Sequence, residues 1–266
     1  MENKLKNAIA EKGNAVGTFL GISNAALIEN ISTSGLDYIV IDTEHGTYDL
    51  KDVSAMIRAA DSKGLCPVVR VSDPTHREIQ HALDEGAEGI IVPYLRKIED
   101  FRKVAELGKF PPIGCRGFAR GRGSCFGNDD WAAGSPEAYM AASNEKVLLI
   151  PQCETLEALE NIEEIVKIEG IDGIFIGPYD LSICMGIPTQ FDHPDFKAAV
   201  ERIRKACRES GKLCMIYTTT IEEARMRLAE GFEAISHSLD AALYAQVYRE
   251  TMAAIRPSAS SLSEKE

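Results

Sequence analysis

Two carboxylates stand at the ends of two short apolar segments in the middle of the chain. Glu154 follows the run 147–153, and Asp180 closes the segment Gly173-Ile-Phe-Ile-Gly-Pro-Tyr-Asp. If both runs are neighbouring parallel strands, the two acids can share one hard cation, because such cations take oxygen ligands and keep water or substrate in their remaining positions. Each acid alone is more simply a helix cap. Together they predict a metal site.

Other chemically active side chains end neighbouring apolar segments. His45 stands in Asp42-Thr-Glu-His and is a candidate general acid or base, because imidazole exchanges its proton near neutral pH. Arg70 ends a run of Pro67-Val-Val, where it must face an anion, a developing oxyanion or a salt-bridge partner across the mouth of a barrel. Asp84 lies at the end of a helical segment, opposes the helix dipole and therefore needs a partner, for which His45 is one candidate.

The elements that position these groups are short runs of continuous apolar character. Such runs are typical of strands buried on both faces of a parallel sheet. We expect eight of them: Val16–Ile22, Tyr38–Asp42, Cys66–Val71, Gly89–Tyr94, Val147–Cys153, Gly173–Gly177, Leu213–Tyr217 and Ala234–Ser238.

Amphipathic helical patterns lie between the runs, and a glycine follows each, as is typical of a helix C-terminus. The segments are Leu50–Lys63, Pro74–Glu85, Thr155–Glu169, Pro194–Ser210 and Ile221–Glu230, with Gly64, Gly86, Gly170, Gly211 and Gly231 after them. Eightfold alternation of strand and helix predicts an α/β fold, the (β/α)8 TIM barrel. The alternative is a doubly wound sheet, but the expected glycine-rich phosphate turn is missing after the first strand.

Composition limits the class of protein. The chain has 266 residues, 45% of them apolar, and a net charge of −12, which predicts one barrel domain over residues 1–256 and no nucleic-acid partner. Its short apolar runs and polar N-terminus predict no membrane span and no secretory signal. The seven cysteines predict a reduced, cytoplasmic protein. Residues 257–266 read as a disordered tail.

One connection, from Arg96 to Lys146, is unusually long and contains a stretch rich in Gly and Arg at 114–127. Such a segment is expected to be a functional loop, an interface element or a flexible loop. Lysines are not expected at the active ends of the strands, since Lys146 and Lys212 precede strands and Lys97 lies beyond one. This placement argues against a Schiff-base aldolase.

The chain resembles the HpcH/HpaI aldolase family in a series of motifs from about Gly17 to Asp240. The motifs are Asp42-x-Glu-His45, Pro67-Val-Val-Arg70, Leu83-Asp-x-Gly-Ala87 with Ile90-Ile-Val-Pro93, Gln152-Cys-Glu-Thr155, and Glu169-Gly-Ile-Asp-Gly-Ile-Phe-Ile-Gly-Pro-Tyr-Asp-Leu-Ser182. The resemblance implies a class II aldolase that acts on 4-hydroxy-2-oxo acids, with a divalent ion such as Mg²⁺, Mn²⁺ or Co²⁺ as cofactor and with pyruvate and an aldehyde as small-molecule partners. It also implies a homo-oligomer, in many family members a hexamer, built through an exchanged C-terminal helix.

The same resemblance implies a role for each matching residue. The metal would be held by Glu154 and Asp180, and the pyruvate carboxylate by backbone N–H groups near Gly177 and Pro178. Substrate would also meet Gln152 and Asp42. Catalysis would fall to three residues: Arg70 on the enolate oxygen, His45 as the proton relay, and Asp84 as the carboxylate that orients His45.

Two strand ends depart from the family pattern and leave the aldehyde open: Met215-Ile-Tyr-Thr-Thr and Ser238-Leu-Asp240. Two alternatives remain. One is an acyl-CoA carbon–carbon lyase of the malyl- or citryl-CoA type on the same fold, with Arg116, Arg120 and Arg122 forming a basic groove for the CoA phosphates. The other is a catalytically silent barrel that binds a small acid.

Overall fold

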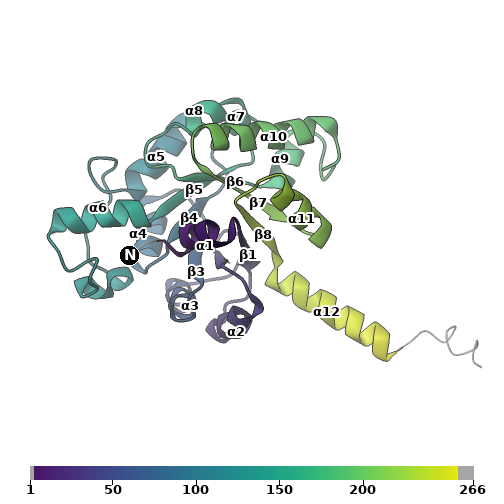
Figure 1. Ribbon diagram of the computed structural model, residues 1–266, viewed down its shortest axis with the longest axis horizontal. Helices are drawn as coiled ribbons and strands as arrows, with labels where there is room; N and C mark the ends of the chain where they lie inside the picture. The colour runs from purple at the N-terminus through teal and green to yellow at the C-terminus, as the bar shows by residue number, and fades with distance from the viewer. Residues whose placement is uncertain (1–2, 257–266) are drawn as a thin grey trace, which may run out of the picture.

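The structure, a computed structural model, describes residues 3–256 and contains a closed barrel of eight parallel strands (Figure 1). Each strand pairs with the next in sequence, and β8 pairs with β1. The (β/α)8 prediction is confirmed, and the eight expected runs all form strands. Their bounds are β1 Ala15–Leu20, β2 Tyr38–Asp42, β3 Cys66–Arg70, β4 Gly89–Val92, β5 Leu148–Cys153, β6 Gly173–Ile176, β7 Leu213–Thr218 and β8 Ala234–Leu239.

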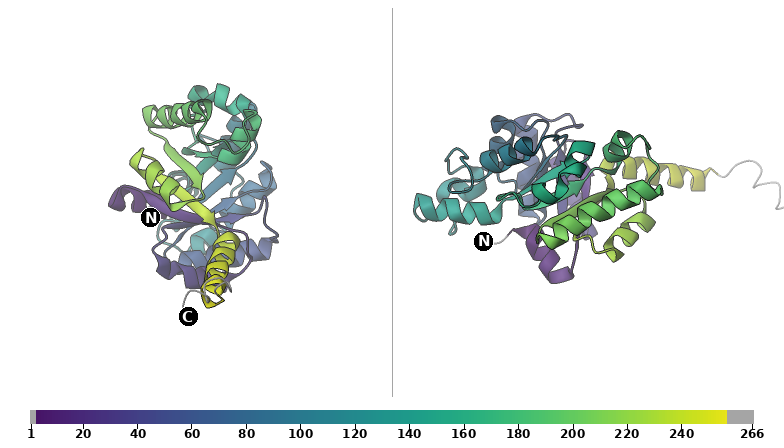
Figure 2. Two further views of the ribbon diagram at one scale, coloured as in Figure 1. Left: turned by 90° about the vertical axis from the view of Figure 1, so that its right-hand side faces the viewer. Right: turned by 90° about the horizontal axis from the view of Figure 1, so that it is seen from above.

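Helices surround the barrel (Figure 2). Their bounds are α1 Lys4–Lys12, α2 Ala25–Ile31, η1 Ser32–Ser34, α3 Leu50–Ser62, α4 His76–Asp84, α5 Ile98–Gly108, η2 Arg122–Gly127, α6 Pro136–Lys146, α7 Leu156–Glu160, α8 Ile162–Ile165, α9 Pro178–Cys184, α10 Pro194–Glu209, α11 Ile221–Ala229 and α12 Asp240–Ile255. The prediction of one helix over Thr155–Glu169 is wrong, because this segment forms two helices, α7 and α8, which meet at Asn161. The five glycines expected at helix ends all have positive φ, a conformation in which glycine avoids the clash that a Cβ makes.

Side chains along each strand point alternately into the barrel and toward the helices, which separates two apolar layers. The same alternation places the polar groups of the site at the inward positions. In β2, Tyr38 and Val40 belong to the core inside the barrel, whereas Ile39 and Ile41 pack against the helices. Because side chains alternate with a period of two, the next inward position is Asp42. The same alternation brings Arg70 to the end of the inward series of β3 and Gln152 to the end of that of β5. The preceding inward residues are Cys66, Val68, Leu148 and Ile150.

The amino end of the barrel is covered by α1. Leu5 joins the core inside the barrel, and Asn3 caps α1 through its side chain while it donates to the carbonyls of Glu88 and Lys146. Lys4 pairs with the buried Glu88 carboxylate at 2.7 Å. These contacts close this end, so that the groups at the carboxyl ends of the strands face the other mouth.

The long connection from Arg96 to Lys146 is not one extended loop, because α5, η2 and α6 lie within it. Its Gly- and Arg-rich part packs on the end of α4: a Cβ at Gly123 would lie 2.6 Å from the Cα of Gly86. This part of the chain therefore lies near the amino end of the barrel and not at its open mouth.

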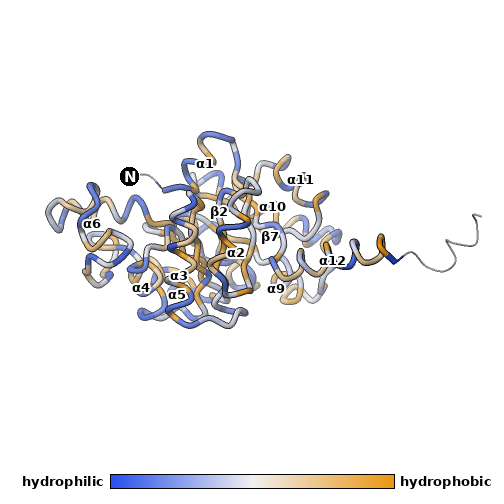
Figure 3. The backbone as a smooth tube through the Cα atoms, turned by 90° about the horizontal axis from the view of Figure 1, so that it is seen from below, coloured by the Kyte–Doolittle hydropathy of each residue, from blue (hydrophilic) through white to orange (hydrophobic). Residues whose placement is uncertain are grey.

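The last helix, α12, leaves the barrel and extends away from it (Figures 1 and 2). Hydrophobic residues recur along its length (Figure 3). Over the described residues, no helix has the length and apolar character that a membrane span requires. The predicted tail, 257–266, lies outside the described residues.

Candidate active site

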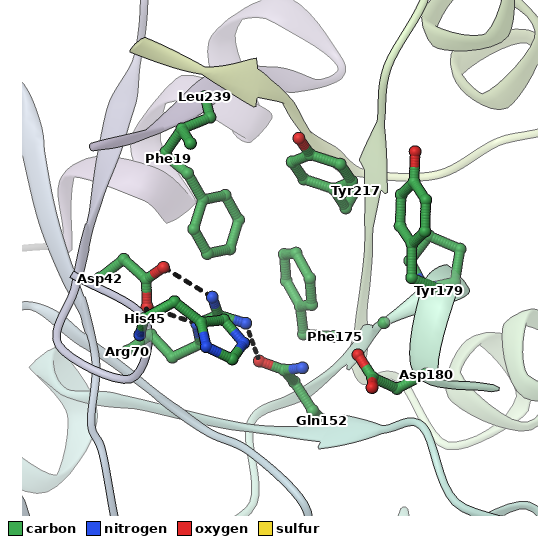
Figure 4. Close-up of a pocket in the computed structure, with 12 residues that line it drawn as sticks. Phe19, Asp42, His45, Arg70, Gln152, Phe175, Tyr179, Asp180, Tyr217 and Leu239 are labelled. Atoms are coloured by element: carbon green, nitrogen blue, oxygen red, sulfur yellow. Dashed lines mark hydrogen bonds and ion pairs between the residues drawn. The ribbon is translucent and has the colours of Figure 1, made fainter. Parts of the chain in front are cut away.

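A cavity of about 320 Å³ opens at the carboxyl ends of the strands (Figure 4). In a (β/α)8 barrel this is the end at which active sites lie. The structure brings seven of the nine predicted site residues to its lining: Asp42, His45, Arg70, Gln152, Gly177, Pro178 and Asp180. An eighth, Glu154, contacts one of these directly. The ninth, Asp84, lies elsewhere.

Asp42 and Arg70 form the central ion pair of the site. Arg70 donates from Nε to Asp42 Oδ1 at 2.8 Å and from Nη2 to Asp42 Oδ2 at 2.7 Å. The two residues are also direct partners in the β2–β3 register. This fork-to-fork contact fixes the guanidinium plane and leaves Nη1 to approach Gln152 Oε1 at 3.4 Å. Both Asp42 oxygens accept from Arg70, so Asp42 positions the guanidinium. Asp42 also lines the cavity, and its direct contact with substrate stays a prediction.

The turn after β2 carries His45 to the mouth of the cavity. The turn is held by Asp42, whose Oδ1 accepts from the Glu44 backbone N–H at 3.2 Å and whose carbonyl accepts from the Gly46 N–H. The His45 side chain is 71% exposed, and its Nε2 lies 3.8 Å from Glu44 Oε2. The acid beside His45 is therefore Glu44, a residue to which the motif analysis gave no role.

Glu44 connects His45 with Arg70. Its Oε2 lies 3.0 Å from Arg70 Nη1 as an ion pair, although this buried oxygen accepts no well-aligned hydrogen bond among the described residues. Burial raises the pKa of the Glu44 carboxyl, while Arg70 and His45 act to lower it. A spare acceptor beside an exposed imidazole is suited to hold or share a proton.

Gln152 and Tyr94 fix the carboxylate of Glu154, of which only 3% is exposed. Gln152 Nε2 donates to Oε2, and the Tyr94 backbone N–H donates to Oε1 at 2.6 Å. Tyr94 has a φ of 56°, a left-handed conformation that is strained for a tyrosine and occurs often at functional sites. The strained backbone aims this N–H at Glu154.

Glu154 is held in an environment that opposes its ionisation. Burial raises the pKa of its carboxyl to about 7, and the nearby Asp180 and Glu44 carboxylates act in the same direction, whereas the hydrogen bond from Tyr94 opposes the rise. A carboxylate desolvated beside other carboxylates gains from a cation that neutralises them.

Gly177 leaves the space in which Glu154 and Gln152 lie. A Cβ at this position would overlap Glu154 Oε2 and would approach Gln152 Nε2 to 3.0 Å. Asp180, in the first turn of α9, presents its carboxylate to the same cavity (Figure 4). Two carboxylates and an amide side chain suit a hard divalent ion that completes its shell with water or substrate oxygens. No group of three or more His, Cys, Asp or Glu residues arranged for a metal was found in residues 3–256, so substrate and water would have to supply the other ligands.

The opposite wall of the cavity is apolar, and two of its residues, Tyr217 and Leu239, lie in the strand ends that depart from the family pattern. It is formed by Phe19, Phe175, Tyr179, Tyr217 and Leu239. Phe19 packs edge-on against Phe175 and Tyr217, and the Arg70 guanidinium lies 4.8 Å from the centre of its ring. Phe19 and Phe175 have no sequence signal beyond their position near strand ends, which apolar core residues share.

The structure corrects the predicted place of Asp84. It ends α4, and a helix that runs antiparallel to the strands ends beside their amino ends, away from the cavity. Its Oδ1 accepts from Arg116 Nη2 at 2.8 Å, and it shares a small cavity with Lys146 and Val147, which precede β5. The prediction that Asp84 orients His45 within one chain is therefore wrong; its partner is Arg116.

The arginines of the long connection also lie away from the cavity. Arg116 is engaged by Asp84, Arg120 donates to the Gly134 carbonyl, and Arg122 donates to the Glu85 carbonyl. They cannot form a basic groove at the mouth of the same barrel, which removes the feature that favoured an acyl-CoA substrate. No lysine lies among the described residues that line the cavity, in agreement with the argument against a Schiff base.

Comparison with known proteins places this geometry in a family. The family model described as HpcH/HpaI aldolase/citrate lyase matches residues 15–246. The chain belongs to this family. It is 31% identical to the 2-keto-3-deoxy-L-rhamnonate aldolase of Klebsiella pneumoniae, over 100% of this chain and 97% of the relative. It is 32% identical to the 4-hydroxy-2-oxo-heptane-1,7-dioate aldolase of Shigella flexneri, over 99% and 96% of the two chains.

Solved structures of the HpcH/HpaI family have the same fold as this chain. The crystal structure of the HpcH/HpaI aldolase from Desulfitobacterium hafniense superposes with a TM-score of 0.87 and 26% identity, over 96% of this chain and 97% of that one. The resemblance drawn from the strand-end motifs is confirmed, and the protein is an enzyme of the carbon–carbon lyase class.

Proposed function

We propose that this protein is a metal-dependent aldolase that cleaves, or forms, 4-hydroxy-2-oxo acids, with pyruvate and an aldehyde as the two products of cleavage. The observation that carries the proposal is the meeting of Arg70, fixed by Asp42, with Gln152, Glu154 and Asp180 at one wall of a small cavity. The relatives named as aldolases of 2-oxo acids support it.

Glu154 and Asp180 would hold the divalent ion, for which Mg²⁺, Mn²⁺ and Co²⁺ are candidates. Such an ion, when bound, supplies a Lewis acid that stabilises negative charge on the 2-oxo acid. The space left by Gly177 and the raised pKa of Glu154 both suit this role. The backbone after Gly177 and Pro178 lies beside the same wall, where its N–H groups can meet the substrate carboxylate.

Arg70 would stabilise the charge that develops when the bond between C3 and C4 of the substrate breaks. Cleavage places an electron pair on the pyruvate unit, which delocalises onto the C2 oxygen as an enolate. A guanidinium already oriented by Asp42 stabilises such a charge without reorganising during the step. Protonation at C3 then gives pyruvate.

His45 would take the proton of the C4 hydroxyl as the aldehyde forms. Its place at the mouth, on a turn that Asp42 holds, leaves its imidazole free to reach that hydroxyl. Glu44 lies within reach to orient the imidazolium or to accept its proton. We therefore propose Glu44, in place of Asp84, as the carboxylate that orients His45.

The decisive experiment follows pyruvate release from 4-hydroxy-2-oxopentanoate, coupled to lactate dehydrogenase, with Mn²⁺ and then with EDTA. We expect turnover with the ion and none with the chelator. Glu154→Gln should lose both turnover and Mn²⁺ binding measured by calorimetry. Glu157→Gln, at an exposed ion pair with Arg96, is the matched control and should keep both. A folded protein that binds Mn²⁺ but releases no pyruvate from this or any other 4-hydroxy-2-oxo acid would favour an acyl-CoA lyase or a silent acid-binding barrel.

We further propose that the protein is a homo-oligomer, in the family manner a hexamer, in which α12 packs on a second copy. Along this helix, apolar residues recur at the spacing of one helical face, and each is at least 40% exposed: Tyr244, Val247, Tyr248, Met252 and Ile255. A largely apolar groove of about 370 Å³, lined in part by Val16, Leu27, Ile31 and Leu36, lies beside the start of α12. An exposed apolar stripe and an apolar groove on one chain fit an exchange between copies.

A further inference from the structure

The cavity is divided between two arcs of the barrel. The polar side chains come from β2, β3 and β5 and from the start of α9, whereas β6, β7, β8 and β1, which are consecutive in the closed barrel, contribute only apolar or aromatic side chains. Figure 4 shows Phe19, Tyr217 and Leu239 across the view from Gln152 and Asp180, with Phe175 between the two groups. The apolar arc consists of Phe175, Tyr217, Leu239 and Phe19.

The proposed chemistry uses only the polar arc. The pyruvate unit of a 4-hydroxy-2-oxo acid has to reach Arg70, Glu154 and Asp180, so the rest of the substrate extends from C4 toward the facing arc. The aldehyde product is that remaining part. The residues of the apolar arc therefore select the aldehyde.

The distribution of charge around the cavity is unfavourable for a second anion. Among the described lining residues, Arg70 is the single permanent cation, and its charge is already met by Asp42 at 2.7 Å and Glu44 at 3.0 Å. Asp180 adds another carboxylate to the wall. A carboxylate or phosphate on the aldehyde would lose water against an aromatic surface without gaining a cation, and burial of an unpaired charge is strongly unfavourable.

The packing of the apolar arc is suited to a flat or branched apolar group. Phe19 stands edge-on to Phe175 with ring centres 5.7 Å apart and to Tyr217 with ring centres 5.6 Å apart. Tyr217 also meets Tyr179 edge-on, so the aromatic surface continues toward the mouth. The cavity volume of about 320 Å³ lies at the small end of the ligand pockets of proteins, roughly 300–1,000 Å³.

We infer that the aldehyde is uncharged and carries a small aromatic or apolar substituent, which packs against Phe19, Phe175 and Tyr217. This inference rests on the proposed aldolase function and adds the class of the second substrate. It excludes aldehydes with a terminal carboxylate or a phosphate as preferred partners.

Binding is tested with two 2-oxo acids that lack the C4 hydroxyl and so cannot be cleaved. With Mn²⁺ present, calorimetry compares 2-oxo-4-phenylbutanoate with 2-oxoheptanedioate, which ends in a carboxylate. We expect the phenyl compound to bind at least about tenfold more tightly, as burial of a ring-sized apolar group predicts. The kcat/KM for pyruvate release from the corresponding 4-hydroxy acids should show the same order. Equal affinities, or tighter binding of the dioate, would overturn the inference.

A charge placed in the apolar arc should reverse the order. Tyr217→Lys puts an ammonium where the terminal carboxylate of the dioate would lie, so the ratio of the two dissociation constants should shift toward the dioate by at least about tenfold. Met226→Lys adds the same charge on the exposed side of α11, away from the cavity lining, and should leave the ratio unchanged. A shift of the same size in both variants, or in neither, would contradict a role for the apolar arc.

A half-reaction separates failure of the inference from failure of the proposed function. An enzyme that forms the pyruvate enolate exchanges the methyl protons of pyruvate for deuterium in D2O, which NMR follows without any aldehyde. Exchange that depends on Mn²⁺, together with a preference for the dioate, would overturn the aldehyde class alone. A folded protein without exchange and without pyruvate release would overturn both.

Discussion

Both carboxylate oxygens of Asp42 accept hydrogen bonds from Arg70, so a single residue sets the plane and position of the only permanent cation among the described residues that line the cavity. The pair is made possible by register: Asp42 and Arg70 are direct neighbours on β2 and β3 and both occupy inward positions. Asp42 reduces the net positive charge of the pair but fixes the position of the guanidinium. The stabilisation of a developing oxyanion depends strongly on that position.

Replacement of Asp42 by Asn should therefore lower kcat rather than raise KM. The variant keeps the side-chain shape but loses the charged fork, and a misplaced guanidinium should reduce kcat for pyruvate release by about 100-fold. Asp192→Asn, in which the fully exposed Asp192 loses its surface ion pair with Lys197, is the control and should keep the kcat of the unsubstituted protein. If Asp42 instead contacted substrate directly, the main change would be in KM with kcat retained.

The space at Gly177 gives a second prediction. In Gly177→Ala, the new methyl group would displace Glu154 Oε2 and crowd Gln152, so Mn²⁺ affinity measured by calorimetry should fall at least about tenfold. Gly134→Ala is the matched control and should keep its Mn²⁺ affinity, because a Cβ at this position makes only an ordinary contact with Ala138 at 3.4 Å. Unchanged Mn²⁺ binding in a folded Gly177→Ala would contradict the placement of the metal at Glu154.

The sequence predicts the barrel well because local signals and global topology agree. Apolar runs of strand length and glycines after helices mark the elements, and a parallel sheet buried on both faces is the arrangement in which such runs fit. The same regularity predicts much of the site. Asp42, Arg70 and Gln152 follow inward apolar residues at a spacing of two, and the carboxyl ends of parallel strands meet at one rim.

What the sequence did not predict depends on contacts between elements. Phe19 and Phe175 are apolar residues within apolar strands, and nothing local distinguishes a cavity wall from a packed core. The Tyr94 N–H reaches Glu154 only because φ is positive at that residue. Asp84 was assigned to the site from a motif, although the direction of α4 carries its last residue to the opposite rim.

The raised pKa of Glu154 makes metal binding depend on pH. In the metal-free protein this carboxyl has a pKa of about 7, and an ion can bind only its ionised form. Mn²⁺ affinity should therefore fall up to about tenfold for each pH unit below 7 and should level off above it. Calorimetry between pH 5.5 and 8 measures this slope, and an affinity independent of pH across this range would contradict the raised pKa.

The same group should affect stability in the metal-free protein. Its folded pKa of about 7 lies above the ordinary value of 4.5, so between these values the folded state binds more protons than the unfolded state, and stability falls as pH rises. The decrease is on the order of 3 kcal/mol across this window. Glu154→Gln cannot titrate, so its Tm should depend less steeply on pH than that of the unsubstituted protein in EDTA.

The exposed stripe of α12 gives the last prediction. Val247, 59% exposed, lies in the middle of the stripe formed by Tyr244, Tyr248, Met252 and Ile255, and a carboxylate there would be buried without a partner if the helix packs on a second copy. Val247→Asp should therefore lower the mass measured by light scattering toward that of one chain, while circular dichroism still reports a folded barrel. Gln246→Glu adds the same charge to the neighbouring residue, off the stripe, and should keep the assembly. An unchanged mass for a folded Val247→Asp would show that α12 is not the contact between copies.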